Sequence, residues 1–287
     1  MVTRRNGGVD VVFRVPSWSE RWVLEDGVTM PETSEHRLTC ELLEMILRAW
    51  IARTGRDAAV YANLALRWDE EHPAVGVDPD VCLVDPTPPD AKLRSLRTWE
   101  PGHAAPRVAV EVVRPDTAEK DYFEGPAKYA ASGTRELWVF DPERRGRGAL
   151  GPSVLQVWRR MDDGAFRRVF AGDAPAYSDE LGAWLVVTDD GTRLRLADDE
   201  AGERRWLTGE EAARAQAQAD RERAQAERAQ AQAERERAQA ERERAQAERE
   251  RAQAERERAD ALAERIAALE AQLNASDALP RGPSSAR

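Results

Sequence analysis

Cysteines and long apolar stretches, which mark secreted and membrane-spanning proteins, are scarce in this chain. Only two cysteines occur in 287 residues, and Cys40 and Cys82 both lie in apolar patterns, which favours small buried hydrophobes over a disulfide or metal ligands. Nowhere are there 18 consecutive apolar residues, and the beginning, MVTRRNGGVDVVFRVPSW, has no apolar run long enough for a signal peptide. The sequence therefore predicts a soluble cytoplasmic protein.

An excess of basic residues is also lacking. The formal net charge is −10, and acidic residues outnumber basic ones both up to Trp206 and after it. Broad non-specific binding of DNA depends on clustered Lys and Arg, so this composition counts against it but leaves room for a narrow basic groove. No Gly-rich phosphate loop, Cys/His zinc spacing or Ser/His/Asp order stands out either.

A helix is predicted where SEHRLTCELLEMILRAWIARTG begins, with Thr33 or Ser34 as its cap and Gly55 as its closing residue. Apolar residues recur along it at helical spacing, which predicts one side that packs on a core. These residues are Leu38, Leu42, Met45, Ile46 and Ala49.

Strand-like runs follow at residues 58–68, 77–85, 107–113, 136–140, 154–160, 166–171 and 181–187. One short helix interrupts them within residues 124–133, where Pro126 suits the first helical position and Gly133 the closing one. This order predicts one globular α+β domain over residues 1–206, built on a mixed central sheet.

The composition changes abruptly after that domain to Ala, Gln, Glu and Arg, with AQAERER recurring every seven residues. Helix propensity and pairs such as Arg237 with Glu241 predict one long charged helix over residues 207–274, roughly 100 Å long if continuous. Residues 275–287 are expected to form a disordered tail.

Two interpretations of this helix remain open. Its far end has aliphatic residues at the spacing of a coiled-coil seam, namely Leu262, Ile266, Leu269 and Leu273. When the same heptad frame is continued toward the start of the helix, the seam positions are occupied by Ala and Glu, which pack poorly in a coiled coil. The repeat can therefore be a homodimer-forming helix with a short apolar tip, or a single charged helix that never associates.

A carboxylate inside an apolar strand is the most informative feature of the domain. In PRVAVEVV, Glu111 stands among valines, where an ionised group is costly unless something positive is near it. Asp80, in VDPDVCLVD, stands at the mouth of another apolar strand. If the two strands are neighbours, both carboxylates can bind one Mg²⁺, which would activate water for phosphodiester hydrolysis while a nearby Lys128 orients it or stabilises negative charge.

Several weak motifs in a fixed order carry a family resemblance. LEDG, SEHRL at the start of a helix, PDV, VEVVRP and KYAASGTRELWVFDP together resemble the Uma-two family of restriction endonuclease-like proteins, in the PD-(D/E)XK nuclease superfamily. The resemblance covers about residues 22–142. It implies a PD-(D/E)XK nuclease-like mixed sheet flanked by helices and a metal-dependent endonuclease that acts on DNA.

The resemblance also implies roles for individual residues. Asp80 and Glu111 match the Mg²⁺ ligands of the family, Mn²⁺ being a possible substitute, and the backbone carbonyl of Val112 matches a further ligand. Glu35 and His36 match polar positions of the first helix, where a Glu can add to the metal shell and a His can face the phosphate.

The lysine of the superfamily motif is replaced in this chain. It normally stands two residues after the Glu, at the position of Val113 here, and in many family members it stands instead on the following helix, at the position of Gly125. Lys128 is the best substitute by position, and Lys120 is the second.

Each candidate also has a purely structural interpretation. Asp80 can be a turn residue after Pro79, and Glu111 can pair with Arg107, Arg114 or Arg135. Lys128 and Lys120 can be ordinary solvated lysines, and His36 a surface residue.

Two functions therefore remain in competition. The first is a Mg²⁺-dependent DNA endonuclease that dimerises through its tail. The second is a catalytically inactive nuclease-fold module that binds or scaffolds partners, which the acidic composition and Val113 favour.

Overall fold

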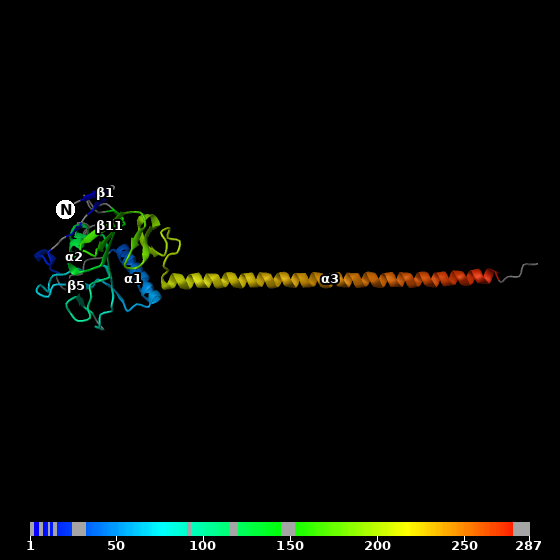
Figure 1. Cartoon of the computed structure of the whole chain (residues 1–287). Coiled ribbons are helices and arrows are strands. Elements are labelled where there is room, and N and C mark those ends of the chain that lie inside the picture. The colour runs from blue at the N-terminus through cyan, green and yellow to red at the C-terminus, as the bar shows by residue number, and fades with distance from the viewer. Residues whose placement is uncertain are drawn as a thin grey trace, which may run out of the picture. The chain divides into compact units, whose positions relative to one another are not determined.

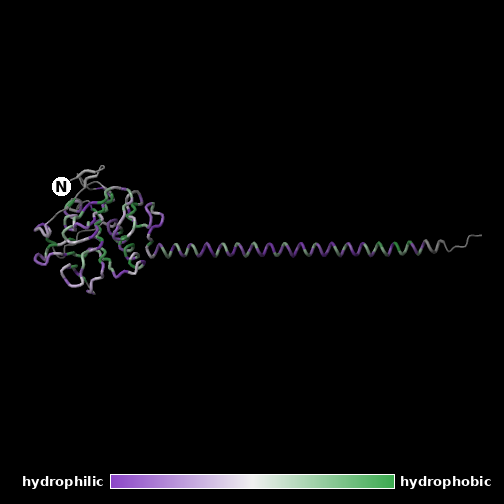
Figure 2. The backbone as a smooth tube through the Cα atoms, viewed as in Figure 1, coloured by the Kyte–Doolittle hydropathy of each residue, from purple (hydrophilic) through white to green (hydrophobic). Residues whose placement is uncertain are grey.

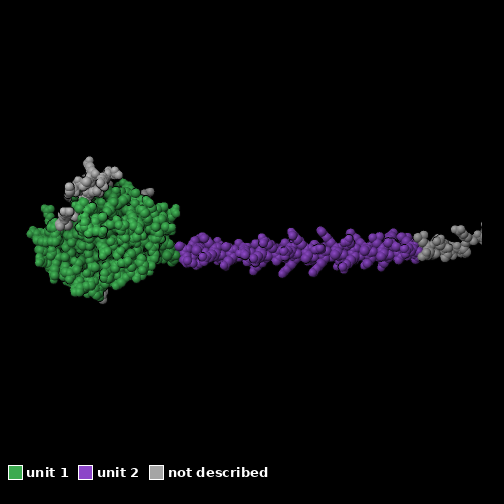
Figure 3. Space-filling model, viewed as in Figure 1, with its two compact units in different colours: residues 1–214 green, residues 215–287 purple. Residues whose placement is uncertain are grey.

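The computed structural model of the chain describes residues 3–5, 8–10, 12–13, 16–24, 33–90, 93–114, 120–144 and 153–277. It divides into two compact units, residues 1–214 and residues 215–287 (Figures 1 and 3). The first unit contains the described strands and the shorter helices, and the second contains most of one long helix. Residues 25–27 of the LEDG motif and the end of the predicted tail, residues 278–287, lie outside the described residues.

Among the described residues, the central sheet has seven strands. Their order is β3 (Val12–Phe13), β11 (Phe166–Gly172), β10 (Leu155–Arg160), β9 (Glu136–Phe140), β8 (Val108–Val112), β6 (Val81–Val84) and β4 (Ala59–Ala62). Neighbouring strands are antiparallel except β8 and β9, which pair in parallel. The predicted mixed sheet is confirmed.

Smaller sheets and short helices complete the first unit. The sheets are β1 (Thr3–Arg5) with β2 (Gly8–Asp10), β5 (Ala65–Arg67) with β7 (Ser95–Arg97), and β12 (Ala176–Ser178) with β13 (Ala183–Thr188) and β14 (Arg193–Ala197). The helices are η1 (Glu20–Trp22), α1 (Ser34–Thr54), the π-helical turn η2 (Lys120–Glu124), α2 (Gly125–Ser132) and η4 (Asp189–Gly191).

Two apolar cores cover the two faces of the central sheet. On one face, alternate strand residues such as Val110 and Trp138 pack with α1 and with the β12–β13–β14 sheet. On the other, the intervening residues such as Ala109 and Val139 pack with Tyr129 of α2 and Tyr122 of η2. This alternation is the two-residue period of a strand buried on both sides, and it confirms the predicted sheet flanked by helices.

Helix α1 begins and ends where the sequence predicts. Thr33 caps it, because its Oγ1 accepts a hydrogen bond from the backbone N–H of His36 at 3.2 Å. Gly55 ends it with a φ of 65°, a left-handed conformation that costs glycine little.

The predicted buried side of α1 is partly wrong. Leu38 and Met45 are 56% and 46% exposed. The buried residues are instead His36, Cys40, Leu43, Ile46, Leu47 and Trp50. Both sets fit a period of 3.6 residues, and the stripe that faces the sheet contains a His, a Cys and a Trp, which an apolar count undervalues.

Helix α2 lies in the crossover between the parallel strands β8 and β9. Pro126 stands in its first turn and Gly133 closes it with a φ of 85°, as predicted. Arg160 of β10 donates to the carbonyls of Tyr129 at 3.2 Å and Ala130 at 2.7 Å, at the negative end of the helix. The helix is thereby fixed on the sheet with Tyr129 in the core.

The long helix α3 (Gly209–Asp277) begins with a capping box. Thr208 Oγ1 accepts from the backbone N–H of Glu211 at 3.2 Å, and Glu211 Oε2 accepts from the backbone N–H of Thr208 at 2.8 Å. The buried guanidinium of Arg195, on β14, donates to both oxygens of Glu211 at 3.0 and 2.8 Å. These bonds join the first turn of the helix to the first unit.

Glu211 provides a test of this anchor by pH. The Arg195 guanidinium and the Thr208 N–H lower the pKa of Glu211 to about 2. A carboxyl whose pKa is lowered by folding stabilises the fold above its unfolded pKa, about 4.3, and this contribution is lost as pH falls toward about 2. Because the side chain is 40% exposed, we expect a loss of only about 1 kcal/mol. Urea unfolding at a series of pH values should show this loss of unfolding free energy in the parent but not in Glu211→Gln. If the two proteins lose stability equally as pH falls, the predicted contribution of Glu211 is wrong.

Along the repeat, the side-chain contacts differ from the prediction. The observed i,i+4 contacts are Gln–Glu hydrogen bonds, for example Gln239 Nε2 to Glu243 Oε1 at 3.0 Å and Gln246 Nε2 to Glu250 Oε1 at 3.1 Å. The expected pairing of Arg237 with Glu241 is not observed in this described part of the helix. Figure 2 shows the helix as largely hydrophilic. No helix among the described residues is long and apolar enough to cross a membrane.

Candidate metal centre

Asp80 directly precedes β6, and Glu111 lies on β8, the strand that pairs antiparallel with β6. Strands β6 and β8 pair with Val81 opposite Val110 and Cys82 opposite Ala109. Continued by one residue, this register puts Asp80 opposite Glu111. Residues directly opposite on paired strands have their Cβ atoms roughly 4.5–5.5 Å apart, a spacing that one divalent cation can bridge. The observed partners of the two side chains belong to helices that cover opposite faces of the sheet, since Asp80 contacts His36 of α1 and Glu111 contacts Tyr129 of α2.

Asp80 is fixed by the backbone beside Glu111 and by α1. Its Oδ2 accepts a hydrogen bond from the backbone N–H of Val112 at 2.7 Å and lies 3.2 Å from His36 Nε2. The side chain is 14% exposed, so it lies at the rim of the buried region. The hydrogen bond from Val112 joins residues 32 positions apart in the chain. Asp80 is therefore more than a turn residue after Pro79.

Glu111 is buried, at 7% exposure, and its Oε1 accepts a hydrogen bond of 2.5 Å from the hydroxyl of Tyr129. Burial raises the pKa of Tyr129 well above its usual value, and the charges of Glu111 and Asp80 raise it further. The hydroxyl therefore keeps its proton and stays a donor at neutral pH.

Tyr129→Phe should separate this hydrogen bond from packing, because it removes only the hydroxyl. We expect the free energy of unfolding without metal to fall by about 1–3 kcal/mol, the typical cost of removing one partner of a buried charged hydrogen bond. Added Mg²⁺ should recover part of this loss by binding Glu111. Thermal unfolding with Mg²⁺ and with EDTA measures both, and an unchanged stability without metal would contradict the role of the hydroxyl.

Two of the three arginines expected as structural partners of Glu111, Arg107 and Arg135, have partners at the other end of β8. Arg107, which precedes the strand, lies 3.2 Å from Asp85 and 3.1 Å from Glu180. Arg135 lies 3.9 Å from the same Glu180 carboxylate. These two arginines therefore belong to a surface network with Glu180, and their predicted structural bridge to Glu111 is not formed.

Four positions could carry the lysine of the nuclease motif, and their surroundings differ. Val113 is buried, at 4% exposure, and packs in the core with Tyr129. Lys128 is also buried, at 6% exposure, with its Nζ 3.7 Å from Glu124 Oε2, so it is not the solvated lysine of the structural interpretation. Gly125 is buried one helical turn before Tyr129 and has no side chain to offer. Lys120 belongs to η2, and its side chain lies outside the described residues.

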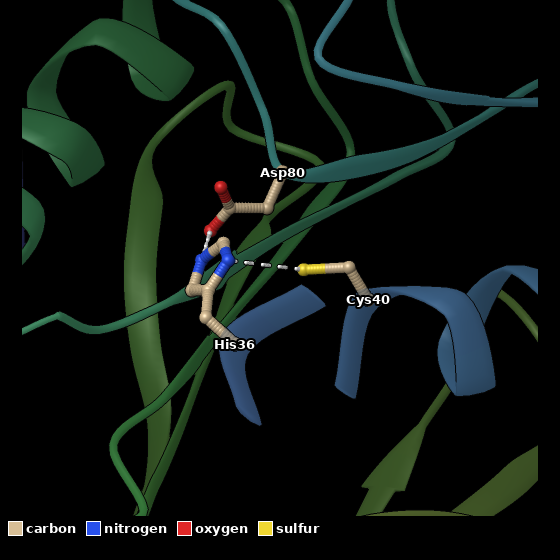
Figure 4. A group of neighbouring side chains, drawn as sticks. All are labelled: His36, Cys40 and Asp80. Carbon is tan, nitrogen blue, oxygen red and sulfur yellow. Dashed lines mark hydrogen bonds and ion pairs between the residues drawn. The ribbon is translucent and has the colours of Figure 1, made fainter. Parts of the chain in front are cut away.

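The two candidates on α1 have different surroundings. Glu35 is exposed, and in the described part of the chain its carboxylate makes no observed contact with Asp80 or Glu111. His36 is buried, at 5% exposure, which rules out the surface interpretation. Its ring lies between Asp80 and Cys40, with Nδ1 3.8 Å from the Cys40 sulfur (Figure 4).

Tyr129 and Cys40 are the members of this site that sequence reasoning missed. Tyr129 follows Lys128 in a short helix, where its position predicts a residue of the apolar face. The residues next to it in the sequence do not indicate that its hydroxyl binds a carboxylate. Cys40 could have been found from its spacing, because positions i and i+4 on a helix place His36 and Cys40 on one face.

Part of the chain is similar to a known protein family. Residues 19–147 match the model of the Uma2 family, described as "Putative restriction endonuclease". This part of the chain is a Uma2-family domain. The domain includes Asp80, Glu111, His36 and Lys128, and the family assignment supports a nuclease.

One solved structure is also similar to this chain, the crystal structure of "a putative nuclease" from Anabaena variabilis. The two chains share 14% sequence identity, and their superposition has a TM-score of 0.38. The match covers 53% of this chain and 76% of the other chain. No curated protein matches the chain.

Proposed function

We propose that the Uma2-family domain is a Mg²⁺-dependent endonuclease that hydrolyses phosphodiester bonds of DNA. Asp80 and Glu111 hold the metal, and Mn²⁺ can replace Mg²⁺. The observation that supports the proposal is the antiparallel pairing of β6 with β8, because its register of Val81 with Val110, continued by one residue, would bring Asp80 opposite Glu111. A pair of hard oxygen ligands suits Mg²⁺ better than softer metals.

Val112 is proposed to supply its backbone carbonyl as a further ligand. The same register, one residue further, puts Pro79 opposite Val112. Proline has no amide hydrogen, so it cannot donate a ladder hydrogen bond toward that strand. The N–H of Val112 meanwhile orients Asp80.

Lys128 is proposed to orient the attacking water or to stabilise negative charge on the phosphate. The bound metal would polarise the phosphodiester and acidify a water molecule. Lys128 is buried in the turn that carries Tyr129, and an ammonium with little solvent around it interacts more strongly with developing charge. Two such domains held together through α3 would allow both strands of a duplex to be cut.

The competing proposal is an inactive binding module, which the buried Val113 at the lysine position of the motif favours. A nuclease assay separates the two. Supercoiled plasmid, single-stranded DNA and single-stranded RNA should each be incubated with the protein and Mg²⁺, Mn²⁺ or EDTA. The endonuclease predicts metal-dependent nicking of the plasmid, and RNA cleavage without DNA cleavage would overturn the choice of substrate.

A further inference from the structure

The geometry points to a second metal site, in which His36, Cys40 and Asp80 bind Zn²⁺. Each residue offers one ligand atom, and the three atoms lie within 4.8 Å of one another. Around a tetrahedral zinc ion with bonds of about 2.0–2.3 Å, ligand atoms are roughly 3.3–3.8 Å apart. The closest contacts are 3.2 Å from His36 Nε2 to Asp80 Oδ2 and 3.8 Å from the other ring nitrogen, Nδ1, to Cys40 Sγ, so they belong to different nitrogens of the ring.

The fold holds these ligands on rigid elements. His36 and Cys40 are one turn apart on the buried face of α1, and Asp80 is held by the Val112 N–H at the start of β6. Figure 4 shows the imidazole between the carboxylate and the sulfur. Because the ring stands between its two partners, it must turn for one ring nitrogen, the sulfur and a carboxylate oxygen to face a common point, and water can supply the fourth ligand at the exposed rim of Asp80.

Chemistry separates this site from the proposed Mg²⁺ centre. Thiolate and imidazole ligands favour Zn²⁺ over Mg²⁺. A thiolate and a carboxylate carry two negative charges, which a divalent cation neutralises in a region where His36 and Cys40 are 5% and 8% exposed. Binding would release the thiol proton of Cys40, so zinc affinity should fall as pH is lowered.

The two sites share Asp80, and this has a regulatory consequence. Zn²⁺ bound by His36 and Cys40 would withdraw Asp80 from Mg²⁺, so the nuclease would be inhibited by zinc. This consequence rests on the proposed function. The zinc site itself does not, since its binding can be measured on a protein that cuts nothing.

The test uses Zn²⁺ calorimetry and the absorption spectrum of the Co²⁺-loaded full chain. The parent should bind one Zn²⁺ per chain in the presence of millimolar Mg²⁺, and its Co²⁺ form should show a thiolate charge-transfer band in the near ultraviolet. Cys40→Ser and His36→Asn should each weaken Zn²⁺ binding at least about 100-fold. Cys40→Ser should also abolish the band.

Matched controls come from the other cysteine and the other acidic–histidine group. Cys82 is buried among apolar residues, and burial raises its pKa to about 12, so Cys82→Ala should keep both the affinity and the band. His103→Asn removes the ring from the group formed by Asp90, Glu100 and His103 and should also leave both unchanged.

Three outcomes would overturn the inference. They are a parent that binds no Zn²⁺, a Co²⁺ band that survives Cys40→Ser, and Zn²⁺ binding that is lost in His103→Asn while Cys40→Ser retains it. Because the first concerns the parent protein alone, the inference stays testable even if a variant fails to fold.

Discussion

Asp80→Asn and Glu111→Gln are each expected to lower the rate of metal-dependent plasmid nicking at least about 100-fold. Both changes keep the shape of the side chain and its capacity to accept a hydrogen bond, but they remove the negative charge that a Mg²⁺ ion needs. The rate should be measured with saturating plasmid over a range of Mg²⁺ and Mn²⁺ concentrations. High Mn²⁺ should recover part of the activity if the loss is one of metal affinity.

Two carboxylates elsewhere in the same sheet provide matched controls. Asp85 stands at the opposite end of β6 from Asp80 and pairs with Arg56 at 2.8 Å. Glu136 on β9 is buried, as Glu111 is, but it accepts hydrogen bonds from Trp138 at 2.7 Å and Arg159 at 3.1 Å. Asp85→Asn and Glu136→Gln should therefore change stability while retaining nicking.

The control results decide how the main result is interpreted. If all four variants lose activity together, the cause is damage to the sheet and not loss of metal ligands. If Asp80→Asn and Glu111→Gln nick the plasmid as fast as the parent, the proposed nuclease mechanism is wrong. A parent that does not cut at all would favour the binding module.

Substitution of the exposed aliphatic residues near the end of α3 is expected to convert a homodimer into a monomer, which halves the mass of the particle in solution. Leu262, Ile266 and Leu269 are 61%, 53% and 53% exposed in the single chain, and their spacing is that of a coiled-coil seam. We propose that a second copy of the chain covers them. Replacing all three by Ser should convert a dimer into a monomer, which light scattering coupled to gel filtration measures directly.

The control for this variant must account for the weaker helix propensity of serine. Arg256, Glu257 and Glu264 are exposed residues of the same helix, and their replacement by Ser should leave the dimer intact. Truncation after Arg214 keeps the Arg195–Glu211 anchor and should give a monomer. A parent that is already monomeric would show that α3 is a single charged helix.

Much of the fold could be predicted from the sequence because its signals are local. The caps at Thr33 and Gly55, the Pro126 to Gly133 helix and the valine-rich strand around Glu111 all depend on residues close together in the chain. The repetitive Ala, Glu, Arg and Gln composition likewise predicts the helix α3.

The contacts within the site could not be predicted in the same way, because they join distant segments. The hydroxyl of Tyr129 meets Glu111 across 18 residues, and His36 meets Asp80 across 44 positions of the chain. Sequence patterns indicate which face of a strand a residue occupies, but not which side chain covers it. For the same reason the predicted buried stripe of α1 is only partly right: Ile46 is buried, but Leu38 and Met45 are exposed, because only packing on the sheet selects between two stripes that fit the helix.

Binding of Mg²⁺ or Mn²⁺ to the parent and to Asp80→Asn, Glu111→Gln and the double variant tests the shared metal site most directly. Isothermal titration calorimetry should find an oxygen-ligand site on the parent, with affinity at least about 100-fold lower in either single variant. The double variant should be little worse than each single one, because both residues serve one ion. An affinity that neither substitution lowers, or losses that add in the double variant, would contradict a metal ion held jointly by Asp80 and Glu111.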